Sequence, residues 1–195
     1  MIPLQDQKRD LRFRLRQELA KISDAEKRSS SARLLVQLQN FSRWKDSGTL
    51  LLFAPREDEP DILPLIPESL SLGKRVTLPR YNQSKGIYEA AEVKSLEELQ
   101  VGSYGIREPS ASAEMVALNR LDLVLIPGLG FDLHGHRLGR GRGFYDRLLA
   151  GLPGIKCGVA FDQQVISKLP IEPHDVILNS LVTPSRSLEF TQNVA

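Results

Sequence analysis

Glycine and arginine alternate in one short segment of the chain, and this pattern is typical of a loop that binds anions. Residues 139–143 read Gly-Arg-Gly-Arg-Gly, between an apolar run that ends at Pro127 and an apolar stretch that starts at Phe144. A glycine-rich loop between a strand and a helix exposes backbone N–H groups to phosphate, and arginine side chains add positive charge. We therefore predict a general anion site, with a solvated basic turn as the alternative. Its cations are Arg137, Arg140, Arg142 and Arg147.

Two common phosphate-binding motifs do not fit this segment. The P-loop motif G-x-x-x-x-G-K-[ST] is absent from the chain. The dinucleotide motif needs G-x-G-x-x-G directly after a strand, whereas these glycines are spaced G-x-G-x-G and lie about a dozen residues beyond Ile126. Asp162 lies where a ribose-binding acid would follow such a motif, but the glycine spacing argues against that interpretation.

Three aspartates, Asp132, Asp146 and Asp175, are candidate ligands for a divalent metal ion. Mg²⁺ bound with a nucleotide usually takes one or two carboxylates together with phosphate oxygens. Asp146 directly follows the glycine loop and could hold a metal ion against the phosphates. The alternative for Asp146 is an acid that favours the first turn of a helix, and the alternative for Asp175 is a polar turn. The histidines lack the spacing of a zinc site, so we do not expect zinc.

A second acidic segment follows a predicted buried strand. Residues 54–61 (APREDEPD) carry four acids, which could bind a cationic or N–H-rich edge of a substrate. A solvated acidic loop is the default interpretation of such a segment.

The N-terminal segment predicts an amphipathic helix with a cation at the margin of its apolar face. Its apolar residues recur at helical spacing, at Leu4, Leu11, Leu15, Leu19 and Ile22. At 100° per residue, Lys8 falls inside the margin of this face and Arg12 just beyond it. A lysine in that position either extends its amine to water or meets an anion, and the helix geometry leaves both possibilities open.

The predicted elements alternate between strand and helix. Apolar runs at 49–54, 121–126 and 155–160 predict buried strands, and helices are predicted from Ser23 to Asn40 and over 144–150. We therefore expect an α/β fold: a three-layer, open, mostly parallel sheet with helices on both faces. Ligands bind such sheets at the carboxyl ends of the strands, where the glycine loop falls. We expect a single domain over 1–195, with a loose tail at 190–195.

The composition and charge of the chain argue against nucleic-acid and membrane partners. A net charge of +2 argues against a dedicated nucleic-acid binder. The chain has neither a run of about 18 apolar residues nor a signal peptide, so we expect no membrane partner. The single cysteine, Cys157, fits a reducing compartment, and we expect a cytoplasmic location. The sequence does not reveal the oligomeric state, and a monomer is our working expectation.

With these residues assembled, the chain resembles the 5-formyltetrahydrofolate cyclo-ligase family over nearly its full length. The main family signature is present as IPGLGFD (126–132) and RLGRGRGFYD (137–146). Five further family motifs follow the family order, as KRDLR (8–12), the acids Glu59 and Asp61 within 55–61, LPR (78–80), GIREP (105–109) and LPIEPHD (169–175). The chain departs from many members by Arg142 in place of a glycine and Phe144 in place of a tyrosine.

The resemblance implies an ATP- and Mg²⁺-dependent enzyme that converts 5-formyltetrahydrofolate into 5,10-methenyltetrahydrofolate, with release of ADP and phosphate. Phosphorylation of the formyl oxygen would turn an inert amide into a reactive group. The family pattern places Arg140, Tyr145 and Asp146 in catalysis and Asp146 and Asp175 on the metal ion. It places Phe53, Pro55, Glu59 and Arg80 on the folate. It places on ATP the residues Lys8, Arg9, Asp10, Leu11, Arg12, Arg137, Leu138, Gly139, Arg140, Gly141, Arg142, Gly143, Phe144 and Tyr145.

Two other classes of protein remain as alternatives. A sugar-phosphate isomerase, or another phosphate-binding α/β protein, would also carry anion loops but would need neither ATP nor Mg²⁺. An RNA-binding protein would need stacking aromatic residues beside the basic loop, and only Phe144 and Tyr145 are close in sequence.

Overall fold

The computed structural model describes residues 3–173 and 175–190 of the 195-residue chain. Its helices are α1 (Leu4–Ala20), α2 (Asp24–Asn40), α3 (Ser42–Asp46), α4 (Leu65–Ser71) and α5 (Phe144–Leu149), with short 3-10 turns η1 (Leu96–Glu98), η2 (Leu118–Arg120) and η3 (Asp162–Gln164). Its strands are β1 (Thr49–Leu51), β2 (Arg75–Asn82), β3 (Ile87–Glu92), β4 (Gln100–Val101), β5 (Arg107–Glu108), β6 (Met115–Val116), β7 (Leu123–Ile126), β8 (Gly130–Asp132), β9 (Arg137–Leu138), β10 (Ile155–Val159), β11 (Val165–Ile166), β12 (Ser180–Val182) and β13 (Ser187–Glu189).

The main sheet is mixed and mostly parallel, which confirms the predicted fold class. Its strand order is β13-β12-β10-β7-β1-β2-β3-β6. The strands from β12 to β2 are mutually parallel, while β13, β3 and β6 run antiparallel to their neighbours. Two smaller sheets accompany it, β11-β8-β9 and β4-β5.

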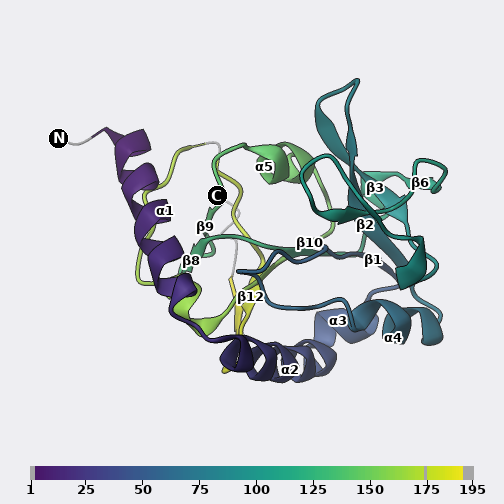
Figure 1. Ribbon diagram of the computed structural model, residues 1–195, viewed down its shortest axis with the longest axis horizontal. Helices are drawn as coiled ribbons and strands as arrows, with labels where there is room; N and C mark the ends of the chain where they lie inside the picture. The colour runs from purple at the N-terminus through teal and green to yellow at the C-terminus, as the bar shows by residue number, and fades with distance from the viewer. Residues whose placement is uncertain (1–2, 174, 191–195) are drawn as a thin grey trace.

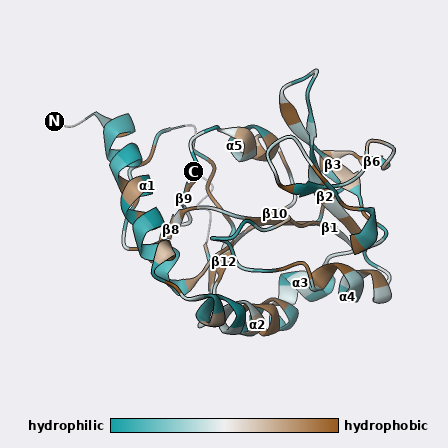
Figure 2. Cartoon of the chain, viewed as in Figure 1, coloured by the Kyte–Doolittle hydropathy of each residue, from teal (hydrophilic) through white to brown (hydrophobic). Residues whose placement is uncertain are grey.

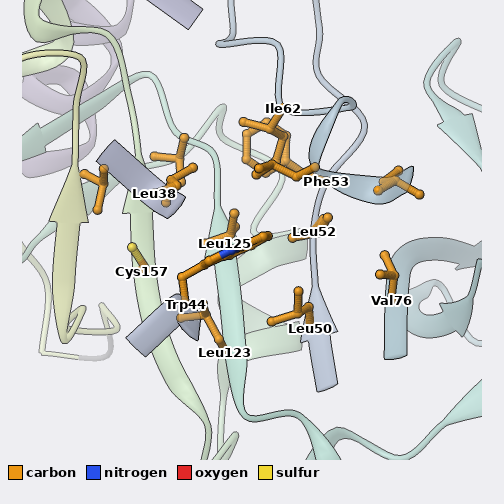
Figure 3. Packing of buried hydrophobic residues seen from close by; sticks show 14 of the residues in the cluster. Leu38, Trp44, Leu50, Leu52, Phe53, Ile62, Val76, Leu123, Leu125 and Cys157 are labelled. Atoms are coloured by element: carbon orange, nitrogen blue, oxygen red, sulfur yellow. The ribbon is translucent and has the colours of Figure 1, made fainter. Parts of the chain in front are cut away.

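Both faces of the central strands are buried, as continuous apolar runs predict. Successive side chains of a strand point to opposite faces. Leu123 and Leu125 therefore belong to one core cluster, with Trp44 of α3, while Val124 and Ile126 belong to another. Figure 3 shows part of the first cluster. In Figure 1, α2, α3 and α4 lie on one side of the sheet and α5 lies on the other.

Helix α1 stands apart from the main sheet, beside β8 and β9 (Figure 1). Figure 2 shows that its residues are mostly hydrophilic, with a few apolar ones among them. The predicted apolar face is buried: Leu11 and Leu15 pack against Leu138 of β9, and Leu19 packs in a further small cluster. α1 therefore rests on the hairpin that precedes the glycine loop.

Some predicted elements have different limits in the structure. β1 ends at Leu51 rather than residue 54, although residues 52–54 stay buried. The segment between Ile126 and the glycine loop, where we predicted no strand, contains the β8–β9 hairpin. The sequence marks α2 correctly, because the Ser23 hydroxyl accepts a hydrogen bond from the Glu26 backbone N–H at 3.2 Å.

No helix in the described ranges is long and apolar enough to cross a membrane. The tail predicted at 190–195 lies outside the described residues, apart from Phe190.

Candidate functional site

A cavity of about 400 Å³ opens at the carboxyl ends of the central strands. Ala54 follows β1 into its wall, Pro79 comes from β2, and Pro127 and Gly128 follow β7. The glycine loop closes one side, so its predicted place at this edge of the sheet agrees with the structure. The remaining lining residues are Arg16, Arg56, Glu59, Tyr88, Tyr104, Ile106, Arg107, Glu108, Arg137, Gly139, Arg140, Arg142, Gly143, Phe144, Tyr145 and Asp146.

The three glycines of the loop meet two steric requirements, a positive φ and a close side-chain approach. Gly141 (φ +102°) and Gly143 (φ +63°) adopt backbone conformations that other residues rarely take. Gly139 has an ordinary φ, but a Cβ there would lie 3.0 Å from a guanidinium nitrogen of Arg137. Among the described residues, the backbone N–H groups of 139–143 donate no hydrogen bond. The loop therefore presents unused donors beside the cavity.

Two of the cations of α1 contact the glycine loop and the C-terminal part of the chain. The amine of Lys8 is buried and lies 2.6 Å from Asp175 and 2.8 Å from Glu172. Burial alone would lower the pKa of Lys8, but these two carboxylates raise it above its ordinary value. The Nε of Arg12 donates to the Gly139 carbonyl at 2.9 Å. Of the two possibilities that the helix geometry allowed, Lys8 therefore binds anions and does not extend its amine to water.

The carboxylate of Asp146 pairs with a buried arginine inside the cavity wall. Arg137 donates to Asp146 at 2.6 Å and to the Pro127 carbonyl at 3.1 Å. Its guanidinium also lies 5.6 Å from the centre of the Tyr145 ring. Asp146 remains partly exposed and lines the cavity, while Arg137 holds its carboxylate in place.

Arg140 bridges the glycine loop and the acidic segment. It donates to Asp58 at 2.6 and 3.0 Å and to Glu59 at 2.8 and 3.1 Å. Burial would raise the pKa of Asp58, but Arg140 holds it below its ordinary value. Glu59 is almost fully buried, and burial keeps its pKa above the ordinary value although Arg140 opposes the shift. Arg140 therefore holds Asp58 and Glu59 at the site, whereas the other two acids of the segment, Glu57 and Asp61, are exposed.

Four aromatic rings pack together beside the loop. Phe144 contacts Tyr81, Tyr88 and Tyr104, with ring centroids 5.3–5.5 Å apart. The guanidinium of Arg142 lies 4.8 Å from the centre of the Tyr104 ring. Burial and the nearby charge of Glu108 raise the pKa of Tyr88 to about 12. Burial also raises the pKa of the Tyr145 hydroxyl, so this group stays protonated and can only donate or accept a hydrogen bond.

Several residues that the sequence assigned to the site lie outside the cavity wall. Arg9 and Asp10 are on the exposed side of α1, where Arg9 pairs with Asp6 at 2.9 Å. Leu11 and Leu138 pack against each other in a small core cluster. Gly141 lies in the loop but does not line the cavity.

Of the residues predicted to bind the folate, one lines the cavity and the others do not. Glu59 lines the cavity, while Pro55 lines an adjoining hollow of about 720 Å³. Phe53 is buried in the main core, as Figure 3 shows. Arg80 bonds the carbonyls of residues 110 and 111, away from the cavity.

The three candidate metal carboxylates have different surroundings. Asp132 is fully buried and accepts hydrogen bonds from the backbone N–H groups of His134, His136 and Leu169, so its position is structural. Asp146 lines the cavity, and Asp175 lies on Lys8. Over residues 3–173 and 175–190, no group of three or more His, Cys, Asp or Glu side chains is arranged to hold a metal ion. Mg²⁺ with a nucleotide needs only one or two carboxylates, so the oxygen donors of Asp146 and Asp175 fit such a role.

Several residues of the cavity wall were not predicted from the sequence. Tyr88 lies on the β2–β3 hairpin and Tyr104 in the β4–β5 turn, and both line the cavity. No local sequence pattern predicts these contacts. Glu108 belongs to the segment GIREP, which was noted only as a family motif. Two adjacent charged residues in this short motif, Arg107 and Glu108, were the available signal.

Comparison with known proteins identifies the family of this chain. The model of the 5-formyltetrahydrofolate cyclo-ligase family matches residues 4–184. The 5-formyltetrahydrofolate cyclo-ligase of Escherichia coli (strain K12) is 37% identical over 147 residues, covering 73% of this chain and 81% of that protein. The one from Mus musculus is 28% identical over 187 residues, covering 90% and 92%.

The fold is shared with a solved structure. The NMR structure of Aquifex aeolicus 5,10-methenyltetrahydrofolate synthetase superposes with a TM-score of 0.86 at 34% identity, covering 96% of this chain and 95% of that one. The chain therefore belongs to the 5-formyltetrahydrofolate cyclo-ligase family, ATP-dependent ligases of one-carbon metabolism that convert 5-formyltetrahydrofolate into 5,10-methenyltetrahydrofolate.

Proposed function

We propose that the family reaction takes place in the cavity at the carboxyl ends of the strands, with the glycine loop holding the terminal phosphates of ATP. One observation carries this assignment. A single cavity is lined by Asp146, which is partly exposed, by the buried Glu59 and by residues 139, 140, 142 and 143 of the glycine loop, whose N–H groups are unused among the described residues. Donors for phosphate and acceptors for a substrate are thus within reach of one another, as a transfer between two bound ligands requires.

The chemistry begins with an unreactive group. Resonance makes the formyl amide a poor electrophile. Its oxygen attacks the γ-phosphorus of ATP, the bond to ADP breaks, and the formyl oxygen becomes a phosphate leaving group. The second nitrogen of the folate then attacks the formyl carbon and loses its proton, the C–O bond breaks, and phosphate departs. The ring is closed without any oxidation or reduction.

The protein's own part in this sequence is alignment and charge stabilisation. The loop N–H groups and Arg142 would stabilise the negative charge on the transferring phosphoryl group. Tyr145 stays protonated and supports the site as a hydrogen-bond donor. Arg140, tied to Asp58 and Glu59, would hold the loop against the folate side of the cavity. Phe53 and Arg80 lie outside the wall, so we assign them a supporting role on β1 and β2.

Mg²⁺ is part of the proposal. Asp146 would hold the ion at the cavity. Asp175, which is paired with Lys8 of α1, would supply a second carboxylate. When bound, the ion would neutralise charge on the β- and γ-phosphates. Lys8 and Arg12 would bind the remaining phosphate charge, and each charge-assisted contact of this kind contributes about 1.5–3 kcal/mol.

The direct test mixes the purified protein with 5-formyltetrahydrofolate and MgATP. We expect the methenyl product to form, detected by its near-ultraviolet absorbance, and to disappear when either ATP or Mg²⁺ is omitted. Asp146→Asn should lower turnover at least about 100-fold, as expected for loss of a metal ligand at phosphoryl transfer. No product at any ATP concentration would refute the assignment, and product without ATP would favour an ATP-independent phosphate-binding protein.

The proposal includes a cytoplasmic location and a monomeric state. The single cysteine, Cys157, is buried and has no disulfide partner. A cytoplasmic monomer that acts on a small reduced folate, without nucleic acid, fits this composition. Cell fractionation and light scattering of the purified protein test these two properties.

A further inference from the structure

One acidic side chain on the cavity wall has an oxygen without a partner. Glu108 is only 6% exposed and lies on β5. Its Oε2 accepts a hydrogen bond from the backbone N–H of Tyr81 at 3.0 Å. Its Oε1 is fully buried and meets no donor among the described residues. Buried polar atoms in native proteins nearly always have partners, so this oxygen needs an explanation.

The surrounding chain makes room for the carboxyl group. A Cβ at Gly102 would lie 2.3 Å from the Glu108 carboxyl carbon, so any larger residue there would displace it. The backbone N–H of Gly102 bonds the carbonyl of Ile106 at 2.8 Å, which closes the β4–β5 turn around the acid. The carboxyl group is therefore held in place by β2, through the Tyr81 N–H, and by the β4–β5 turn, through Gly102.

The chemical neighbourhood selects the type of ligand. Burial raises the pKa of Glu108, opposed by the Tyr81 N–H and by the charge of Arg80. No cation forms an ion pair with this acid in the described part of the chain, in contrast to Asp58, Glu59 and Asp146. A phosphate group would be repelled here. A neutral, flat group that carries N–H donors would fit beside the rings of Tyr88 and Tyr104.

The substrate of the family supplies such a group. The pterin ring of a reduced folate carries a ring N–H next to an exocyclic amino group, and these two parallel donors match the two oxygens of a carboxylate. We propose that Glu108 is a specificity-determining residue whose free oxygen, together with the oxygen held by Tyr81, accepts this N–H edge of the pterin ring. The inference rests on the proposed function and assigns a residue for the folate half of the site.

The first experiment compares Michaelis constants. Glu108→Ala should raise the KM for 5-formyltetrahydrofolate about 10- to 100-fold, the effect of losing one or two charge-assisted hydrogen bonds. The KM for ATP should stay within about twofold of the wild-type value. Glu97→Gln is the control, because Glu97 is an exposed acid on the nearby η1 turn. An unchanged KM for folate, or an equal rise for ATP, would overturn the proposal.

A second experiment separates recognition from folding. Glu108→Gln keeps the shape and the acceptor for Tyr81, so its melting temperature without ligands should match the wild type. The increase in melting temperature on adding 5-formyltetrahydrofolate should be lost in this variant. If the increase persists at full size, Glu108 does not bind the substrate.

An altered substrate gives the sharpest test. A 5-formyltetrahydrofolate analogue without the 2-amino group should bind the wild-type protein about 10-fold more weakly or worse. Glu108→Ala should discriminate little between the two substrates, because the partner of that amino group is gone. Equal discrimination by both proteins would refute the proposed contact. Wild-type protein that forms no methenyl product would refute the proposed function instead, so the two failures are distinguishable.

Discussion

At the scale of single residues, the cations predicted to bind ATP are already held by other groups of the protein. Lys8 is paired with Glu172 and Asp175, Arg137 with Asp146, and Arg140 with Asp58 and Glu59. These contacts fix long side chains in place before any ligand arrives, which lowers the entropy that binding must overcome. They also mean that phosphate competes with carboxylates for these cations.

Asp132 and Asp146 illustrate how the same residue type takes different roles. Both lie in the family signature and both were candidates for a metal ion. Asp132 is closed in by three backbone N–H groups and by His136, whereas Asp146 faces the cavity. The number of donors around each carboxylate, which the sequence does not show, separates the two.

Asp132→Asn should lower the free energy of unfolding by about 2–3 kcal/mol, because the amide cannot replace a carboxylate that accepts several N–H groups. Burial would raise the pKa of Asp132, but hydrogen bonds from Leu169, His136 and His134 hold it below its ordinary value. The stabilisation is therefore present above the unfolded-state pKa and is lost as the pH falls through the lower folded-state pKa.

Denaturant unfolding at neutral and acidic pH measures this effect. The difference between wild type and Asp132→Asn should shrink as the pH falls. Asp162→Asn is the matched control, because within 3–173 and 175–190 the Asp162 side chain accepts a hydrogen bond only from the exposed Ser185 hydroxyl. A difference for Asp132→Asn that does not depend on pH would contradict the assignment.

At the scale of elements, the site depends on a loop between a two-stranded hairpin and a six-residue helix. The β8–β9 hairpin carries the loop away from the main sheet, and α1 rests on this hairpin through Leu11 and Leu15. Helix α5 packs against the opposite end of the loop with Phe144 inserted among three tyrosines. Both ends of the loop are thus anchored, and the glycines between them determine its shape.

Gly143→Ala and Gly151→Ala form a matched pair that tests the loop. Both positions have positive φ, +63° and +73°, and they flank α5 at its two ends. Each substitution should cost about 1–2 kcal/mol of stability, because alanine is disfavoured in this conformation. Only Gly143→Ala should also lower kcat/KM for ATP, about 10- to 100-fold, because a small displacement misaligns the phosphates. Equal activity losses in the two variants would show that the loop has no special role.

At the scale of the whole molecule, distant parts of the chain meet at the cavity. At the cavity wall, Arg140 contacts Glu59 from the first half of the chain. Outside this wall, Lys8 of the first helix contacts Asp175 near the end of the chain. The three layers share the central strands, so the two core clusters are contiguous through the sheet. We therefore propose that the chain folds as one cooperative unit.

Calorimetric unfolding tests this proposal. We expect a single transition whose calorimetric and van't Hoff enthalpies agree. MgATP at 100 times its dissociation constant should raise the melting temperature by about 5–10 °C, since binding to the folded state alone contributes about 2.7 kcal/mol. Two separate transitions, with only one shifted by MgATP, would indicate two domains.

The sequence by itself indicated the main buried strands, the helix α2 and a loop suited to anions. Apolar runs such as 121–126 indicate buried strands because both faces of a parallel strand are covered, and Ser23 marks the start of α2 because its hydroxyl caps the helix. Alternating glycines indicated a special backbone, and Gly141 and Gly143 do adopt positive φ. These signals are local, since they depend on the preferences of neighbouring residues.

Only the tertiary structure decided which side chains share the cavity. Phe53 points into the core and Arg80 away from the site, although both were assigned to the folate. Glu108 and Tyr88 reach the cavity from separate strands, and the partners of Lys8 lie more than 160 residues away, as its hydrogen bond to Glu172 spans 164 positions. Such contacts depend on how strands pair and how helices pack over the whole chain, and no spacing within a single segment encodes them.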